Sequence, residues 1–161
     1  MKTFWTLLAI VVAVVIQTAL SRVFPQGPQM FDPFLLVVVY CGLTYGETHG
    51  MLAGAVAGWV QDVLCGGQIA GLSGLTKLIL GFLVGLAGTR FLLVGAAPQI
   101  LVISAATIAD ALLMHSLASV FSIQTLDLSA TGLAIRAVVN ALVGAGIFTM
   151  IDRRVGRESF S

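Results

Sequence analysis

The chain has 161 residues, of which 58% are hydrophobic and only 9% charged, with a mean hydropathy of +1.05. Soluble domains carry roughly a quarter charged residues and about 45–50% apolar residues, so this composition excludes a soluble globular protein and indicates a lipid environment. The formal net charge of +1 argues against nucleic-acid binding. Two cysteines, Cys41 and Cys65, fall in different apolar segments; they could pair, but buried unreactive thiols are expected.

The first apolar segment covers residues 4–23 and follows the single basic residue Lys2. A basic residue before an apolar stretch is also typical of a signal peptide, whose apolar core has about 7–15 residues. This segment is longer, and equally apolar segments follow it. We therefore interpret it as an uncleaved first membrane span.

Two shorter segments come next. A helix is predicted over residues 33–46, with Asp32 as its N-cap and Pro33 as its first helical residue. The polar residues 46–50 are expected to form a tight turn into a third segment, residues 50–65. Both segments are short for a full membrane span, which needs about 20 residues, so the sequence defines their ends least well.

Three longer apolar segments complete the chain. A glycine-rich stretch precedes the fourth, residues 72–90; the fifth covers residues 98–121, and the sixth covers residues 130–151 before a polar tail. The expected fold is an all-α integral membrane protein. It is a single multi-pass domain over residues 1–161 with about six transmembrane helices and short loops.

The basic residues outside the apolar segments predict the orientation of the chain. With six spans, only Arg22 falls on the side opposite the two termini. Cytoplasmic loops of membrane proteins carry the excess of Lys and Arg, so both termini are expected in the cytoplasm. The basic residues on that side are Lys2 and the expected cytoplasmic anchors Arg90, Arg153, Arg154 and Arg157.

Four ionisable residues remain inside the predicted spans: Asp62, Lys77, Asp110 and Arg136. An unpaired charge at the bilayer centre costs about 2.5–3.5 kcal/mol on insertion scales. The signs of these four residues balance. Pairing is therefore expected rather than exposure to lipid.

Glycine spacing favours one particular pair. Glycines recur every four residues on the third segment and again on the fourth, and such ridges of small residues let two helix backbones approach closely. Asp62 ends the first ridge and Lys77 begins the second, so we predict a contact between them, with Gln61 and Thr76 as polar neighbours. The helix-packing glycines are Gly50, Gly54 and Gly58 on the third segment and Gly81 and Gly85 on the fourth.

The second pair combines Asp110, past the middle of the fifth segment, with Arg136, near the start of the sixth. An arginine side chain could reach the carboxylate or extend toward the outer surface instead, so direct pairing is left open. Further polar or small residues share these two faces, which predicts a polar interior seam. They are Ser104, Thr107, Asn140 and Gly144.

Two interpretations of these charges compete. Intramembrane charges often mark a substrate or proton pathway, whereas opposite charges next to small-residue ridges are typical of contacts that fix helix register. We favour the structural interpretation, because a transporter would more often carry a lone carboxylate.

The sequence carries no enzyme signature. His49 and His115 lack further ligands at metal-binding spacing, and neither Ser73 nor Ser116 has histidine and aspartate partners that the topology would bring together. The glycine-rich residues 66–74 lack the Gly-Lys-Ser/Thr ending of a phosphate-binding P-loop. No catalytic residue, cofactor or metal ion is therefore expected.

Residues 32–90 carry a recognisable combination of features. An Asp-Pro pair opens an apolar helix, a glycine ladder leads to a Gln-Asp pair, and a lysine precedes two glycines at four-residue spacing. Together with the chain length, the number of spans and the basic tail, this pattern resembles the rod shape-determining protein MreD family. The residues that carry the resemblance are Asp32, Pro33, Tyr40, Gln61, Asp62, Gly66, Gly67, Gly71, Lys77, Gly81 and Gly85.

The resemblance implies a non-enzymatic scaffold subunit of the bacterial cell-elongation machinery, located in the cytoplasmic membrane. Such a protein would bind MreC, a single-span protein with a periplasmic coiled coil and β-domain. Through MreC it would connect the MreB cytoskeleton to RodA and its penicillin-binding transpeptidase, and so support peptidoglycan synthesis during side-wall growth. A scaffold needs an apolar groove for a partner's helix. The first segment and residues 32–45 are candidates because they lack internal charges.

The resemblance also supplies an alternative function. The family's fold resembles the substrate-binding subunits of energy-coupling-factor vitamin transporters. These subunits dock the transport module through an Ala-x-x-x-Ala pattern in the first helix, and Ala9 and Ala13 have that spacing here. A vitamin-binding subunit would need a polar pocket open to the outside. Few aromatic or hydrogen-bonding residues line up beneath the predicted outer loops, so we prefer the scaffold.

Overall fold

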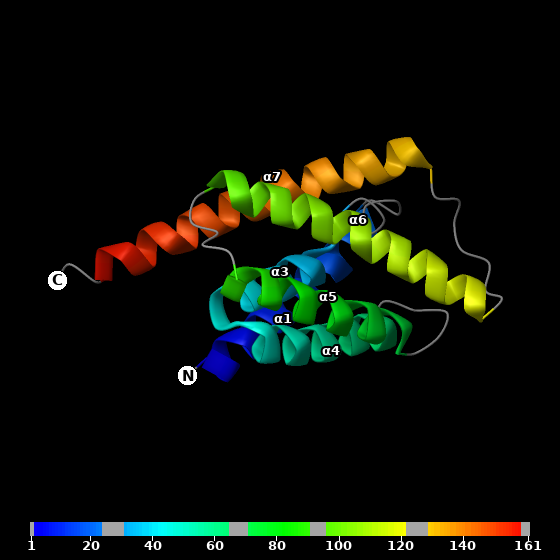
Figure 1. Cartoon of the computed structure of the whole chain (residues 1–161), viewed down its shortest axis with the longest axis horizontal. Coiled ribbons are helices and arrows are strands. Elements are labelled where there is room, and N and C mark those ends of the chain that lie inside the picture. Colours follow the sequence, from blue (N-terminus) through cyan, green and yellow to red (C-terminus); the bar gives the residue numbers. More distant parts are fainter. Residues whose placement is uncertain (1, 24–30, 65–70, 91–95, 122–128, 159–161) are drawn as a thin grey trace.

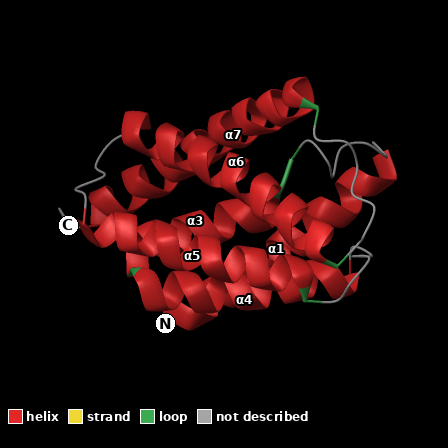
Figure 2. Cartoon of the chain, turned by 45° about the vertical axis from the view of Figure 1, so that its right-hand side comes forward, coloured by secondary structure: helices red, strands yellow, loops and turns green. Residues whose placement is uncertain are grey.

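Six helices make up the part of the chain that the computed structural model describes, which comprises residues 2–23, 31–64, 71–90, 96–121 and 129–158 (Figure 1). No strand occurs in these residues, which confirms the predicted all-α class (Figure 2). In chain order the helices are α1 (Lys2–Val23), α3 (Pro33–Tyr45), α4 (Glu47–Leu64), α5 (Leu72–Arg90), α6 (Ala96–Val120) and α7 (Ala130–Glu158).

Four of these helices are long and apolar enough to cross a membrane. α1, α5, α6 and α7 contain candidate spans of 19 to 24 residues. In contrast, α3 has 13 residues and at ~1.5 Å per residue reaches only about 20 Å, less than the ~30 Å of a bilayer core. Most residues of α3 are buried by the neighbouring helices. The chain is therefore a multi-pass membrane protein with a short helix in its interior.

The connection between α3 and α4 is tighter than predicted. Instead of a polar turn over residues 46–50, the chain reverses at Gly46, which has a φ of +86°. Glycine adopts this conformation without the steric penalty that a side chain would bring. Glu47 then occupies the first turn of α4, where a carboxylate interacts favourably with the helix dipole. The polar residues therefore begin the next helix and do not form a longer loop.

The last helix is also longer than predicted, because α7 continues past residue 151 to Glu158. Residues 152–158 include three arginines and a glutamate, which are good helix formers, and one glycine. The polar tail therefore extends the helix beyond its apolar span.

The helices form two groups (Figures 1 and 2). α3, α4 and α5 pack closely together, with α1 against α3 and α4, while α6 and α7 pair with each other and contact α3; α6 also contacts α5. α1 begins and α7 ends at the same end of the molecule, on the left in Figure 1. An even number of membrane crossings produces this placement of the two ends.

The contact between α4 and α5 is made by backbone atoms. A Cβ atom at Gly54 would collide with the carbonyl oxygen of Lys77, and one at Gly81 would collide with that of Gly50. Each helical turn forward along α4 therefore corresponds to one turn back along α5, and the glycine ridges noted in the sequence lie in this contact. Two further contacts of the same kind join Gly58 to Ser73 and Gly85 to Glu47.

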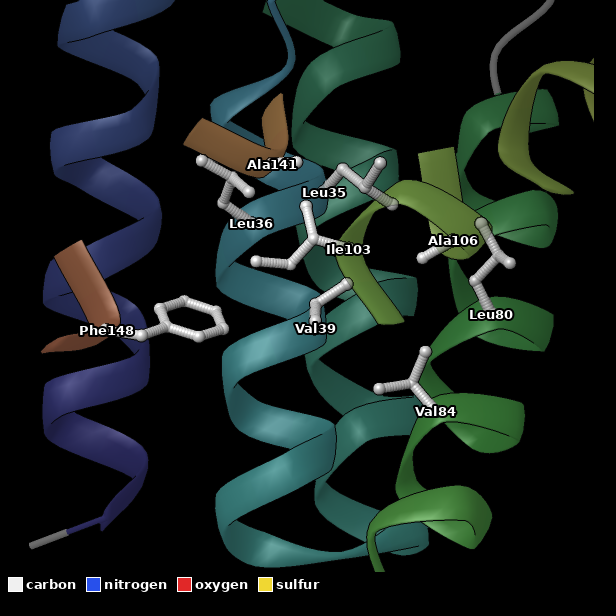
Figure 3. Packing of buried hydrophobic residues seen from close by; sticks show 9 residues of the cluster. All are labelled: Leu35, Leu36, Val39, Leu80, Val84, Ile103, Ala106, Ala141 and Phe148. Carbon is white, nitrogen blue, oxygen red and sulfur yellow. The ribbon is translucent and has the colours of Figure 1, made fainter. Parts of the chain in front are cut away.

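An apolar core joins the two groups of helices (Figure 3). Its side chains come from α3, α5, α6 and α7 and are at most 6% exposed. Because lipid tails are themselves apolar, such a core stabilises a membrane protein through close packing more than through exclusion of water. The core residues are Leu35, Leu36, Val39, Leu80, Val84, Ile103, Ala106, Ala141 and Phe148.

Candidate functional site

The polar interior begins at Asp32, immediately before α3. Its backbone has the extended conformation of an N-cap (φ −121°, ψ 93°), and its Oδ1 atom accepts a hydrogen bond from the backbone N–H of Leu35 at 3.1 Å. Pro33 follows in the first turn, where its missing N–H has no consequence. Asp32 is only 1% exposed, so its other carboxylate oxygen needs a partner inside the protein.

That partner is Lys77 of α5. Its Nζ atom lies 2.8 Å from Oδ2 of Asp32 and 3.5 Å from Oδ1 of Asp110 in α6. Lys77 is 2% exposed, and a cation buried so deeply requires carboxylates beside it. The lysine therefore joins α5 to both α3 and α6.

Arg136 of α7 closes this arrangement into a ring. Its Nη2 atom lies 3.0 Å from Oδ2 of Asp110 and 3.4 Å from Oδ2 of Asp32. The pairing of Asp110 with Arg136, which the sequence left open, is therefore direct. We call Asp32, Lys77, Asp110 and Arg136 the ion network. Its charges alternate and sum to zero.

Two uncharged side chains support the ion network. The amide oxygen of Asn140 accepts the backbone N–H of Asp32 at 3.1 Å, and its amide nitrogen donates to the hydroxyl of Thr107 at 3.3 Å. Both Asn140 and Thr107 are fully buried. Asn140 therefore holds the start of α3, the middle of α6 and its own helix α7 at one point.

Asp62 lies outside the ion network, so the predicted contact between Asp62 and Lys77 is wrong. The Asp62 carboxylate instead accepts three backbone N–H groups at the start of α5, at 2.8 to 3.3 Å, and caps that helix from its neighbour. The cause is the register of α4 against α5. Lys77 lies opposite Gly54, two turns before Asp62, where the backbones leave no room for a side chain between them. The donors to Asp62 are Gly71, Ser73 and Gly74.

The polar neighbours expected around that contact have other roles. The hydroxyl of Thr76 donates to the carbonyl oxygens of Leu72 and Ser73 in its own helix. Gln61 is half-buried on α4. The Lys77 side chain itself extends from α5 to the start of α3 and the side of α6.

Other residues noted in the sequence lie apart from the ion network. Arg90 is exposed in the last turn of α5, and Cys41 is a buried free thiol whose sulfur lies 3.6 Å from the Thr6 hydroxyl. His49 and His115 are exposed, and among the described residues no three His, Cys, Asp or Glu side chains are placed to hold a metal ion. Outside the description lie the side chains of Arg153, Arg154 and Arg157, and all of residues 65–70, including Cys65.

The sequence does not predict the participation of Asp32 in the ion network. Aspartate before proline at a helix start has a sufficient local explanation as a cap, and nothing in its sequence context indicates a further partner. Topology provides the missing signal. α3, α5 and α7 run in the same direction, since each is separated from the next by one intervening helix, and this brings Asp32, Lys77 and Arg136 to similar depth.

The geometry of the ion network determines what it can do. Each carboxylate contacts two cations and each cation contacts two carboxylates. Removal of one partner from a buried ion pair leaves an uncompensated charge and typically costs about 3–5 kcal/mol. Such a ring is suited to fixing the relative positions of the helices that contribute to it.

A second feature is an apolar groove of about 720 Å³. α1 and α7 make no contact with each other in the described part of the chain, and α3 forms the floor between them. We call this space the α1/α3/α7 groove. Its lining includes Trp5, Ala9, Val12 and Ile16 of α1, Val37, Tyr40 and Tyr45 of α3, and Ile147, Phe148 and Ile151 of α7.

The described residues form helices and no strands, and four of these helices contain candidate membrane spans. A neutral ion network is buried between the helices. These features define a multi-pass integral membrane protein. Comparison with known families adds a particular one. The model of the rod shape-determining protein MreD family matches residues 1–151, so the chain belongs to that family, which implies a role in rod-shape determination. No curated protein and no solved structure matches the chain.

Proposed function

We propose that the protein is a non-enzymatic scaffold subunit of the bacterial cell-elongation complex, in the cytoplasmic membrane with both termini in the cytoplasm. It binds MreC and, through MreC, connects the MreB cytoskeleton with RodA and a penicillin-binding transpeptidase. In this position it supports peptidoglycan synthesis along the side wall. The match to the MreD family over residues 1–151 carries the proposal.

The ion network supports a scaffold more than a transporter. A proton relay or transport site depends on an intramembrane carboxylate that changes its charge or its partner. Here Asp32 and Asp110 each contact both Lys77 and Arg136. A closed, neutral ring favours a rigid framework on which other membrane proteins can assemble.

The start of α1 and the end of α7 lie at one end of the molecule. The basic residues at this end indicate the orientation of the protein in the membrane. Arg90 is exposed at the end of α5, and three arginines occupy the last two turns of α7. Basic residues concentrate on the cytoplasmic side, so this end is cytoplasmic in our proposal. Reporter domains active only in the cytoplasm should work when fused to either terminus, and one inserted after Val23 should not.

The competing function is that of a substrate-binding subunit of an energy-coupling-factor transporter. We propose that the chain shares the fold of such subunits. Of the two alanines in the Ala-x-x-x-Ala pattern that such subunits use for docking, Ala9 is half-buried and lines the α1/α3/α7 groove. Ala13 is 2% exposed and belongs to an apolar cluster with Phe34 and Ala57. This position favours packing within the protein over docking of a transport module.

Purification from native membranes in a mild detergent tests the proposal. We expect MreC, RodA and the transpeptidase to be enriched with the tagged chain relative to an unrelated multi-pass protein purified in parallel. An ATPase pair with a membrane coupling subunit would contradict the scaffold and support transport.

Depletion provides the matching cellular test. Cells that lose the protein should lose their rod shape and become round, and expression of the wild-type chain should restore it. Restoration by the Lys77→Met variant should be reduced in proportion to the amount of folded protein in the membrane. Unchanged rod shape after complete depletion would contradict the proposed function.

A further inference from the structure

We propose that the α1/α3/α7 groove binds an acyl chain of an anionic phospholipid, with the lipid head group beside the end of the groove where α1 begins and α7 ends. The ligand is a lipid of the surrounding membrane, and its binding does not depend on the scaffold function. Three properties of the groove carry the proposal: its extent along the membrane, its apolar lining and the charges at one of its ends.

The groove extends over little more than one leaflet. Its α1 wall runs from Trp5 to Ile16 and its α3 floor from Pro33 to Tyr45, which at ~1.5 Å per residue are about 16 and about 18 Å, little more than half of a ~30 Å bilayer core. The α7 wall is restricted to Ile147–Ile151, at the same end as Trp5. A partner's transmembrane helix would need a surface across both leaflets, whereas an acyl chain needs only one.

The walls offer aliphatic and aromatic surface that is accessible from the bilayer. Leu8 and Val12 line the groove and are 42% and 49% exposed, so its rim faces the membrane. Val37 and Tyr40 of α3 form part of the floor. A flexible hydrocarbon chain can fill a space of this kind without leaving polar groups unpaired.

The charges at one end specify the head group. Lys2 begins α1, and α7 carries Arg153, Arg154 and Arg157 in the turns that follow Ile151. Clusters of basic residues next to a membrane span attract anionic lipids, by about fivefold for each residue near the surface. Trp5 and Tyr45 line this same end, and both residue types are enriched at the level of lipid head groups.

The two tryptophans of the chain allow a direct test. Trp5 lines the groove, whereas Trp59 is 60% exposed on α4 and does not line it. The Trp59→Phe variant, reconstituted in phosphatidylcholine vesicles, is titrated with phosphatidylglycerol or phosphatidylcholine brominated on the acyl chains. We expect Trp5 fluorescence to be quenched with at least about fivefold preference for phosphatidylglycerol. Equal quenching by both lipids would overturn the proposal.

Matched variants distinguish lipid binding in the groove from general attraction of lipid to the protein surface. In Trp5→Phe, the remaining Trp59 should show no preference between the two lipids. Ala9→Phe and, independently, the half-exposed Val12→Phe should fill the groove and abolish the preference at Trp5 without loss of helix content. If the preference survives both substitutions, the basic residues merely collect lipid at the surface and the groove is not the site.

Three further outcomes are decisive. Replacement of Arg153, Arg154 and Arg157 by glutamine should lower the preference for phosphatidylglycerol and leave quenching by phosphatidylcholine unchanged. If co-reconstituted MreC protects Trp5 from both lipids, the groove is a helix-binding site and the lipid proposal falls, although the scaffold function would then gain support. If copurification with MreC fails while the lipid preference is observed, only the proposed function is contradicted.

Discussion

Asp32 and Lys77 form a 2.8 Å ion pair across 45 positions of the sequence. The aspartate also caps α3, and the backbone of the lysine lies against Gly54 of α4. One pair of side chains therefore fixes the start of the short inner helix against the close backbone contact between α4 and α5.

Removal of the lysine charge should strongly destabilise the protein. In Lys77→Met, two buried carboxylates would share Arg136 as their only cation within the ion network. Loss of one partner from a buried ion pair costs about 3–5 kcal/mol, so we expect a markedly lower thermal midpoint in detergent and lower accumulation in membranes. Leu112→Met, on the exposed face of α6, is the matched control and should leave both quantities unchanged.

Double-mutant cycles should identify the partner of Lys77. Asp32→Asn and Lys77→Met should be non-additive, with a coupling energy of about 0.5–3 kcal/mol, because the two side chains are in contact. Asp62→Asn and Lys77→Met should add within about 0.5 kcal/mol. Free energies of unfolding of the four variants in each cycle provide the measurement. A stronger coupling of Lys77 to Asp62 than to Asp32 would refute the ion network as described.

A single methyl group should separate α4 from α5. In Gly54→Ala the new Cβ would meet the backbone carbonyl of Lys77, which cannot move aside as a side chain could. Overpacking of this kind costs about 1–3 kcal/mol. Gly146→Ala is the control, since its Cβ would have nothing within 4 Å, and it should be neutral or stabilise α7 by about 0.5–1 kcal/mol. Equal thermal midpoints for the two variants would argue against the close contact.

Asp62 should act through hydrogen bonds to backbone N–H groups. Asp62→Ala removes the acceptor for the start of α5 and should cost about 0.5–2 kcal/mol, whereas Asp62→Asn keeps one oxygen and should cost less. Hydrogen exchange at Ser73 and Gly74 should accelerate in the same order, wild type, Asn, Ala. If exchange at these amides does not change, the carboxylate does not cap α5.

The ends of most helices could be predicted because local chemistry determines them. The Asp32–Pro33 pair begins α3 in the structure, and Gly46 ends it with a positive φ. The end of α7 is not predicted correctly, because the apolar residues end near Ile151 while the helix continues to Glu158. Hydropathy reports where a helix leaves the membrane, and a helix of good helix formers can continue into water.

The register of α4 against α5 could not be predicted from glycine spacing. The predicted contact of Asp62 with Lys77 would have placed Gly58 near Gly81; in the structure Gly50 lies there, two turns away. A ridge with a period of four residues looks the same after any whole number of turns, so small residues meet in both arrangements. A Cβ atom added at Gly42 of α3 would lie 3.1 to 3.2 Å from backbone atoms of α5, so α3 adds a third helix to the contact. That three-helix contact is not visible in a pairwise comparison of ridges.

Asp32 also imposes an order on the assembly of the protein in the membrane. It is synthesised 45 residues before Lys77 and 104 residues before Arg136. While α3 and α4 are entering the bilayer, its carboxylate has neither of its final cations, and it gains the first only when α5 arrives. The ring closes when α7, the last helix, has been inserted. A chain that stops before α5 therefore retains an uncompensated carboxylate at the start of α3, which distinguishes it chemically from the completed protein.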